Sequence, residues 1–220
     1  MLRHSPGVAV LAALALGLGI GSTTTMYSIT RGILRELPVH EPDRLVHIAV
    51  TDRSAGDDYL RIPVADIAAL RDQQRSFESI AAYEDESIHL GDDTHRAERV
   101  ASAVVTASLF SVLRTSALLG RTLTPQDEQP GAPPVAVLSY ALWQNWYGGD
   151  RGVLGTTIRV NGARFTVVGV MSDGFGFPRK EQLWRPLAVD AASAARLGVS
   201  EGSVPTAYSV IARLRDGVTL

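Results

Sequence analysis

Cysteine is absent from all 220 residues. This absence excludes a disulfide framework, thiol catalysis and zinc sites built from cysteine. Lysine is nearly absent as well, since Lys180 is the single lysine among the 21 lysines and arginines. The formal net charge of −2 predicts neither a nucleic-acid partner nor a polybasic lipid-binding tail. A Walker-type phosphate loop is also missing, so this chain does not hydrolyse ATP by that route.

Charged residues are missing from Gly7 to Thr30, and Val8–Ile20 contains only Ala, Val, Leu, Ile and Gly. An apolar stretch of about 20 residues is long enough to cross a bilayer as one helix. We therefore expect residues 1–37 to form a transmembrane anchor helix with its flanks. The alternative is a cleavable signal peptide, although no clear A-x-A-like cleavage site follows the apolar run.

Small residues recur every four positions within this stretch, at Ala13, Gly17 and Gly21. Such a pattern allows two membrane helices to approach each other closely. We therefore expect this face to pack against another membrane helix. A single helix cannot enclose a pathway, so any transport role requires further helices or further chains.

Residues 38–220 show strand-like and helix-like patterns in turn, which predicts an α+β fold: a mixed α/β domain that follows the membrane helix. The predicted strands cover 44–50, 88–90, 97–105, 135–138 and 207–214. One helix is predicted to begin near Pro63, and Phe77, Ile80 and Tyr83 would continue the side of this helix that faces the core. A second would begin at Thr106 or Ser108. Ser139 would cap a third, which would end at Gly148-Gly149. The loop Pro125–Pro134 is the expected boundary between subdomains.

Asn161-Gly162 is the strongest local pattern, because it separates the β-rich runs Thr157–Val160 and Ala163–Val170. Asn-Gly is the preferred pair in a type I′ turn, where both central residues need a positive φ angle. The sequence therefore predicts a two-residue β-hairpin here.

No catalytic, cofactor-binding or metal-binding residue is predicted, and we expect no enzymatic activity. His89 and His95 flank Asp92-Asp93, which could bind a metal, but a tight turn is the preferred interpretation because side chains along opposite strands would splay apart. The acidic run Glu84-Asp85-Glu86 is expected to be solvated. Ser139 lacks the G-x-S-x-G elbow of a hydrolase nucleophile.

Two aromatic groups have alternative interpretations. Trp143 and Trp146 lie at helical spacing, and Phe175 and Phe177 flank a glycine in a loop. Stripes of this kind usually pack into a core. Alternatively, the four side chains form a surface for a partner or an amphiphilic substrate.

Several short motifs follow one another in a recognisable order. They are Glu41-Pro42-Asp43-Arg44-Leu45-Val46, Leu119-Gly120-Arg121-Thr122-Leu123, Val137-Leu138-Ser139-Tyr140-Ala141-Leu142-Trp143, Ile158-Arg159-Val160-Asn161-Gly162 and Leu183-Trp184-Arg185-Pro186-Leu187. In this order and spacing the chain resembles the N-terminal part of FtsX-like ABC-transporter permeases with a MacB-like periplasmic core domain. The resemblance covers nearly the whole chain.

The resemblance implies a permease subunit in the bacterial inner membrane, with its soluble domain on the periplasmic side. It implies an ATP-binding ABC subunit as the cytoplasmic partner, and other permease helices or a second permease copy within the membrane. ATP hydrolysis by the partner would drive a periplasmic conformational change or export. Such permeases have four transmembrane helices, and Thr219 would cap a further helix, so we expect the domain to continue beyond Leu220.

Two other functions remain open from the sequence. The first is a membrane-anchored or secreted module that binds a periplasmic ligand by itself. The second is a periplasmic hydrolase.

The small-residue face generates a first prediction. Replacing Gly17 with Ile should weaken assembly of the full-length parent protein in detergent, because the larger side chain keeps the helix backbones apart. The assembled fraction can be measured by size-exclusion chromatography, with Leu16→Ile as the matched control. Unchanged assembly of the Gly17→Ile protein would contradict the prediction.

Overall fold

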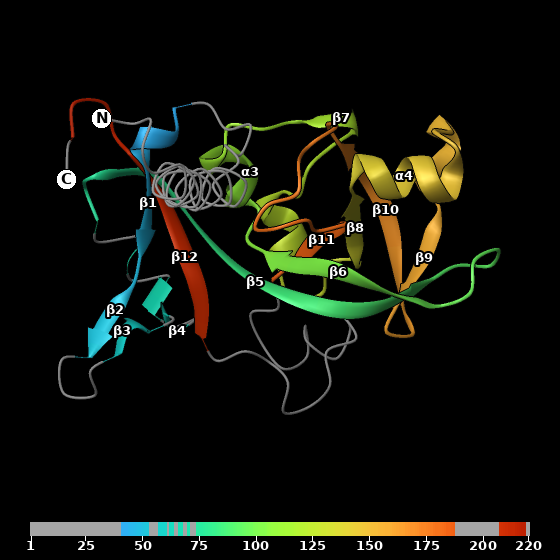
Figure 1. Ribbon diagram of the computed structural model, residues 1–220, viewed down its shortest axis with the longest axis horizontal. Helices are drawn as coiled ribbons and strands as arrows, with labels where there is room; N and C mark the ends of the chain where they lie inside the picture. Colours follow the sequence, from blue (N-terminus) through green and yellow to red (C-terminus); the bar gives the residue numbers. More distant parts are fainter. Residues whose placement is uncertain are drawn as a thin grey trace, which may run out of the picture. The chain divides into compact units, whose positions relative to one another are not determined.

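The computed structural model describes residues 41–52, 57–60, 62–63, 66–67, 70, 74–187 and 207–218. They all belong to one compact unit, Pro38–Leu220 (Figure 1). The predicted anchor, with Ala13, Gly17 and Gly21, lies outside the described residues. Within the ranges given above, no helix combines the length and apolar character of a membrane span.

The described residues form a mixed α/β domain with few helices, as the predicted α+β class requires. The strands are β1 (Leu45–Ile48), β2 (Val50–Asp52), β3 (Asp57–Leu60), β4 (Ile62–Pro63), β5 (Phe77–Gly91), β6 (Glu98–Val105), β7 (Ala117–Gly120), β8 (Val135–Leu138), β9 (Thr157–Val160), β10 (Ala163–Met171), β11 (Leu183–Pro186) and β12 (Ala207–Leu214). The helices are α3 (Ser108–Val112) and α4 (Tyr140–Tyr147), with 3₁₀ turns η2 (Pro42–Arg44), η3 (Pro125–Glu128) and η4 (Arg151–Val153).

Six strands close into a ring, in the order β5, β6, β11, β8, β10 and β9. Side chains alternate along each strand, so every second residue points into this six-stranded ring. In β9, for example, Ile158 and Val160 are buried while Thr157 and Arg159 are exposed. The interior cluster includes Ile88, Val100, Leu138, Val160, Phe165 and Leu183, with Leu142 and Trp143 of α4 packed against it. The apolar interior stabilises the ring by burial.

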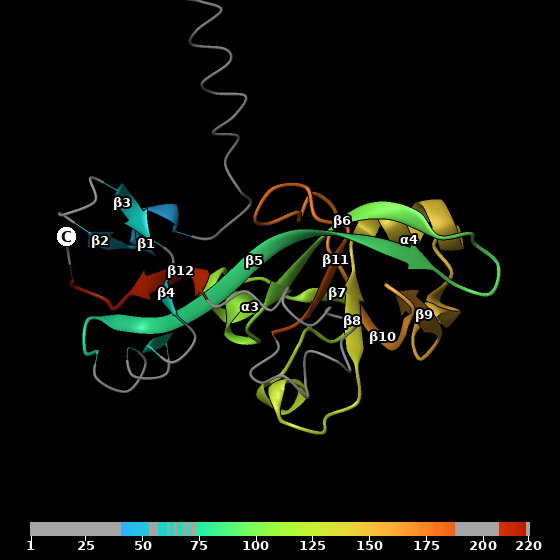
Figure 2. The ribbon, with the colours of Figure 1, turned by 90° about the horizontal axis from the view of Figure 1, so that it is seen from below.

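Strand β5 continues beyond the ring and joins it to a second part of the sheet. It pairs with β12 from Phe77 to Tyr83 and with β6 from Tyr83 to Leu90. Strand β12 pairs in turn with β1 and β4. Figure 2 shows β5 running from β12 at one end to β9 at the other.

The expectation that Phe77, Ile80 and Tyr83 continue a helix is wrong, because all three lie in β5. Ile80 faces one apolar cluster, whereas Tyr83 packs against another. The run Ile80–Ala82 is buried on both faces, so this part of the strand lacks the polar–apolar alternation that would reveal a period of two.

The loop Pro125–Pro134 does not separate two compact units, contrary to expectation. One apolar cluster contains Leu109 and Phe110 from before the loop and Val135 and Val137 from after it. The proline-rich composition correctly indicates a surface loop. The sequence did not show that the residues before and after this loop pack into the same apolar cluster.

Helix α4 begins and ends as predicted. The Ser139 Oγ accepts a hydrogen bond from the Leu142 N–H at 3.1 Å, and Gly148 ends the helix with a φ angle of 57°. Helix α3 differs, because neither Thr106 nor Ser108 caps it. Their hydroxyls bind β5 instead: Thr106 accepts from the Ala82 N–H at 2.9 Å, and Ser108 donates to the Ile80 carbonyl at 2.7 Å.

The predicted hairpin is confirmed between β9 and β10. Asn161 and Gly162 have φ angles of 49° and 86°, as a type I′ turn requires. The turn also closes the six-stranded ring. The Asn161 N–H donates to the His89 carbonyl and the Asn161 Oδ1 accepts from the His89 N–H, both at 2.8 Å. Only Leu90↔Val160 and Gly91↔Arg159 pair β5 with β9. The Asn161 side chain therefore adds a hydrogen bond to a short β5–β9 ladder.

Asn161 therefore has two separable roles, a positive φ angle and a hydrogen bond to β5. Asn161→Gly keeps the backbone conformation but removes the acceptor, and should lower the free energy of unfolding by about 1 kcal/mol or more. Asn161→Asp keeps both features and is the matched control, with a change within about 0.5 kcal/mol. Urea unfolding measures both. Equal stability of the Asn161→Gly and Asn161→Asp proteins would show that the side-chain hydrogen bond does not stabilise the β5–β9 pairing.

Candidate functional site

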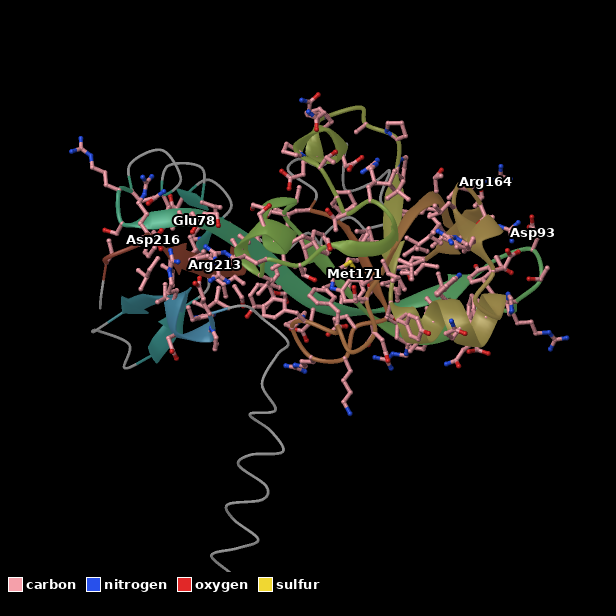
Figure 3. The ribbon with its side chains drawn as sticks, turned by 90° about the horizontal axis from the view of Figure 1, so that it is seen from above. Glu78, Asp93, Arg164, Met171, Arg213 and Asp216 are labelled. Carbon is pink, nitrogen blue, oxygen red and sulfur yellow. The ribbon has the colours of Figure 1, made fainter. Side chains whose placement is uncertain are left out.

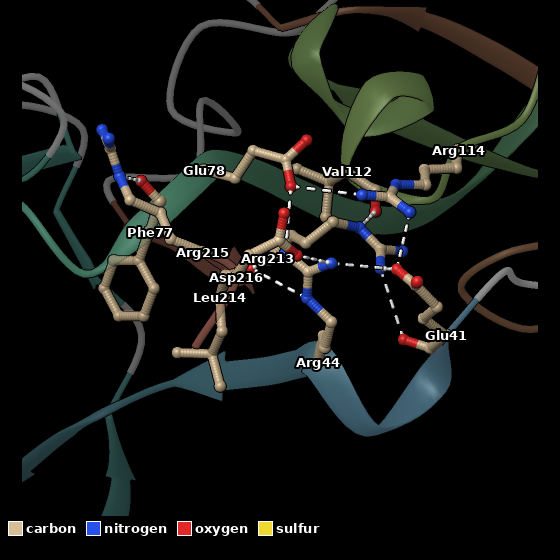
Figure 4. A network of polar contacts seen from close by, with 10 residues as sticks. All are labelled: Glu41, Arg44, Phe77, Glu78, Val112, Arg114, Arg213, Leu214, Arg215 and Asp216. Atoms are coloured by element: carbon tan, nitrogen blue, oxygen red, sulfur yellow. Dashed lines mark hydrogen bonds and ion pairs between the residues drawn. The ribbon is translucent and has the colours of Figure 1, made fainter. Parts of the chain in front are cut away.

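Charged side chains gather where β1 begins and β12 ends (Figure 4). We call this cluster the ionic junction. Its members are the arginines Arg44, Arg114, Arg213 and Arg215 and the acids Glu41, Glu78 and Asp216. They come from η2 and the residue before it, the start of β5, the second position after α3, and the end of β12 with the turn that follows it. The junction therefore joins four segments that are far apart in the sequence.

Arg213 lies at the centre of the junction, with a side chain that is fully buried. Its Nε donates to the Val112 carbonyl at 2.7 Å, and its Nη1 donates to the Glu41 carbonyl at 3.3 Å. Burial lowers the pKa of Arg213, and the neighbouring Arg114 guanidinium lowers it further. A buried charge is costly unless it is paired and hydrogen-bonded, so Arg213 ties β12 to α3 and to the segment before β1.

Arg44 joins the start of β1 to the far end of β12. Its Nη1 lies 2.6 Å from Asp216 Oδ1 and 3.0 Å from Glu41 Oε2. Its Nη2 donates to the Leu214 carbonyl at 2.6 Å and contacts Glu78 Oε2 at 3.3 Å. The guanidinium fork thus bridges three segments with one rigid group.

Glu41 is the shared acceptor, because Oε2 contacts Arg44, Arg114 and Arg213 at 3.0, 2.6 and 3.7 Å. About half of its side chain is exposed, so each outer ion pair contributes only about 0–1 kcal/mol. The carboxylates are neutralised by guanidinium groups rather than directed at a cavity. The arrangement suits a mechanical link between segments and not acid–base chemistry.

Comparison with known proteins agrees with this architecture. Residues 9–220 match the sequence model of the family described as the MacB-like periplasmic core domain. The chain belongs to this family. No curated protein matches the sequence.

Two solved structures are similar to this MacB-like domain in fold. The periplasmic region of MacB from Actinobacillus actinomycetemcomitans has 18% sequence identity and a TM-score of 0.60, over 86% of this chain and 82% of that one. The extracellular domain of YknZ, a noncanonic ABC-type transporter from Gram-positive bacteria, has 16% identity and a TM-score of 0.57. That alignment covers 79% of this chain and 83% of the other.

The four aromatic candidates lie in different surroundings in this MacB-like domain. Trp143 is buried, and its Nε1 donates to the Asp150 carbonyl at 2.7 Å. Phe175 and Phe177 are also buried, against Trp184 and Tyr83. These three positions favour the core-packing alternative. Trp146 is half-buried and stacks on His95, with ring centroids 4.6 Å apart.

The turn between β5 and β6 is confirmed. Two of its side chains, Asp92 and His95, meet instead of splaying apart. The Asp92 Oδ1 accepts from the Thr94 and His95 N–H groups at 2.7 and 2.6 Å, while Oδ2 accepts from the Tyr147 hydroxyl at 2.8 Å. The His95 Nδ1 lies 2.9 Å from Oδ2. Burial raises the pKa of Asp92, but hydrogen bonds from His95, Thr94 and Tyr147 outweigh it and hold that pKa well below its usual value.

The arrangement around His95 differs from a hydrolase triad, in which the acid and the nucleophile contact opposite ring nitrogens. Here Asp92 and the Thr94 hydroxyl both contact Nδ1. In the part of the chain that the structure describes, no group of three or more histidines and acids is arranged to hold a metal ion.

The acidic run Glu84-Asp85-Glu86, which was expected to be solvated, lies within β5 and is partly buried. Glu86 pairs at 2.6 Å with Arg185, whose side chain is fully buried. Asp85 lies 3.5 Å from Arg179. The two arginines follow these acids by more than ninety positions in the sequence, and only the folded sheet brings them together.

Glu181 is a further acid near this group that the sequence did not single out. Only 4% of the residue is exposed. Its Oε2 has no hydrogen-bond partner among the described residues. Burial raises the pKa of Glu181 to about 7, and the negative charge of Asp85 adds to this effect, while Arg179 opposes it. A carboxyl in this position is favoured in its neutral form.

The raised pKa of Glu181 predicts a pH-dependent stability. The folded pKa of about 7 lies above the usual glutamate value of 4.5, so the folded state binds the proton more tightly than the unfolded state. The stabilisation is present below about pH 4.5 and is lost as the pH rises through 7, by up to about 3 kcal/mol. Glu181→Gln should remove this component, so that the variant gains stability over the wild type at pH 8 but not at pH 5. Urea unfolding at each pH measures this difference. An equal difference in the free energy of unfolding between Glu181→Gln and the wild type at pH 5 and pH 8 would contradict the raised pKa of Glu181.

Proposed function

We propose that this chain is part of the permease subunit of an ABC-type transporter in the bacterial inner membrane. The described unit lies on the periplasmic side and has no catalytic activity of its own. Membership of the MacB-like periplasmic core domain family supports this proposal, as do folds shared with domains of MacB and of an ABC-type transporter. The apolar stretch Val8–Ile20 supplies the predicted anchor.

The ionic junction is the observation that carries the mechanical part of the proposal. Glu41 follows the predicted anchor by only four positions and is held by three arginines. The next strand, β1, pairs with β12 along its whole length, from Leu45↔Arg213 to Ile48↔Val210. A displacement of the chain at Glu41 is therefore transmitted to β12 rather than absorbed by a loose linker.

Strand β5 extends this path to the six-stranded ring. It has 15 residues, which corresponds to a length of about 50 Å. Its first half pairs with β12 and its second half with β6. Because these ladders are continuous hydrogen-bonded pairings, a movement at the ionic junction rotates or shifts the ring as a connected body.

The partners that this function requires are an ATP-binding ABC subunit in the cytoplasm and other permease helices, or a second permease copy, in the membrane. The proposal requires no cofactor. An anchored ligand-binding module would also tolerate the fold, but it would have no need for a rigid connection between Glu41 and the sheet.

The test uses the full-length parent protein, reconstituted with its ATP-binding subunit. These 220 residues contain no cysteine, so in a parent protein whose remaining cysteines have been replaced, Ser87→Cys at an exposed position of β5 carries the spin label. We expect the ATP-binding subunit to co-purify, and ATP to change the label-to-label distance between two copies. Glu41→Gln with Arg44→Gln should reduce this change while ATP turnover continues, because the junction no longer transmits movement.

Arg75→Gln is the matched control, since Arg75 is an exposed arginine two positions before β5 and lies outside the junction. It should leave the distance change intact. Failure of any ATP-binding subunit to co-purify would contradict the permease assignment. A full distance change in the Glu41→Gln, Arg44→Gln protein would contradict the role of the junction.

A further inference from the structure

Basic side chains form a row across one outer face of the six-stranded ring. Arg99 in β6 is paired with His89 in β5, and Arg159 in β9 is paired with Arg164 in β10. Arg159 also lies opposite Gly91, two residues beyond His89 in β5. Residues paired across antiparallel strands project from the same face, and all four side chains are on the exposed face. We call this set the basic row.

The basic row carries more positive charge than its surroundings neutralise. Arg159 and Arg164 are directly opposite each other, an arrangement that destabilises a sheet when the charges are alike. Asp93 forms an ion pair with Arg159. No described residue forms an ion pair or side-chain hydrogen bond with Arg99 or Arg164. The fold therefore maintains an unfavourable concentration of charge at this face.

An open pocket of about 600 Å³ lies at one side of the basic row, where His89 and Arg159 line it. Its lining includes His89, Arg159, Asn161 and Gly162, together with Asp92 and His95 of the neighbouring turn. Asp92 accepts hydrogen bonds from the turn and from Tyr147, so its carboxylate is already satisfied. The guanidinium of Arg159 is the charged donor that remains accessible in the pocket.

Asp93 shows which chemical group suits this guanidinium. Its carboxylate contacts Arg159 although 84% of the Asp93 side chain is exposed. An exposed ion pair of this kind contributes little and exchanges readily. Arginine binds carboxylates through two parallel hydrogen bonds, so a carboxylate from another molecule can replace Asp93 and also contact Arg164 or His89.

We propose that the basic row and its pocket bind an acidic segment of a partner protein, with Asp93 as the internal carboxylate that the partner displaces. The position in the fold favours a protein over a lipid headgroup. Figure 3 places Asp93 and Arg164 at one end of the unit and Glu78, Arg213 and Asp216 at the other. Glu41, the first described residue after the predicted anchor, contacts Arg213 at the latter end, so within the unit the basic row lies at the end opposite Glu41.

The inference does not depend on coupling to an ATPase. Binding at this face would serve a transporter subunit and an independent binding module equally. Failure of the ATP-binding subunit to co-purify would therefore leave it untouched.

The experiment measures fluorescence anisotropy of a fluorescein-labelled hexaglutamate peptide with the full chain in a neutral detergent. The wild type should bind the peptide, and binding should weaken with salt because exposed charges are screened. Arg159→Gln and Arg164→Gln should each weaken binding by about tenfold. Asp93→Asn should strengthen binding several-fold, because the internal competitor is removed. A purely structural role for Asp93 predicts no such gain.

Two controls make the outcome decisive. Arg75→Gln removes an exposed arginine at the opposite end of β5 and should leave the affinity unchanged. Arg164→Gln should melt at the wild-type temperature or above it, since it removes a like-charge pair, so lost binding cannot be attributed to unfolding. Equal losses for Arg75→Gln and Arg159→Gln, or unchanged binding in Arg159→Gln, would overturn the proposal. Anionic phospholipid vesicles that displace the peptide at equal charge concentration would overturn the choice of a protein partner.

Discussion

The shared hydrogen bonding of β5 is the constraint on which the rest of the domain depends. Strand β5 pairs with β12 along its first half, with β6 along its second half, and with β9 at its end. Backbone groups of a buried strand must be paired, so these neighbours cannot shift independently. The ring, the ionic junction and the basic row are therefore positioned by one continuous element.

Buried charge is the second feature that organises the domain. Arg213 and Arg185 have no exposed side-chain surface, yet each meets a partly exposed carboxylate, Glu41 and Glu86 respectively. Such pairs add little net stability compared with apolar residues, but removal of one partner leaves an uncompensated charge. They therefore specify which segments meet. Arg213 specifies the meeting of β12 with Glu41, and Arg185 that of β11 with β5.

The two ends of β5 have opposite character. At the junction end every carboxylate lies within ion-pair distance of an arginine. At the far end Arg99 and Arg164 form no ion pair with a described residue, and an open pocket lies beside Arg159. If an acidic partner binds the far end and the anchor moves the near end, each event changes the free energy of the other by the same amount. A stiff strand between the two sites provides the physical connection for that coupling.

The sequence by itself determined the features that depend on neighbouring residues. These are the Asn161-Gly162 turn, the Ser139 cap and the apolar strand β8, and the ordered motifs also indicated the family. Tertiary structure decided the rest. The first half of β5 was hidden because Ile80–Ala82 is buried on both faces, and Thr106 and Ser108 bind β5 instead of capping α3. Burial of Arg213 and the alignment of Arg159 with Arg164 arise from strand register, which is fixed by pairing between distant segments and leaves no local trace.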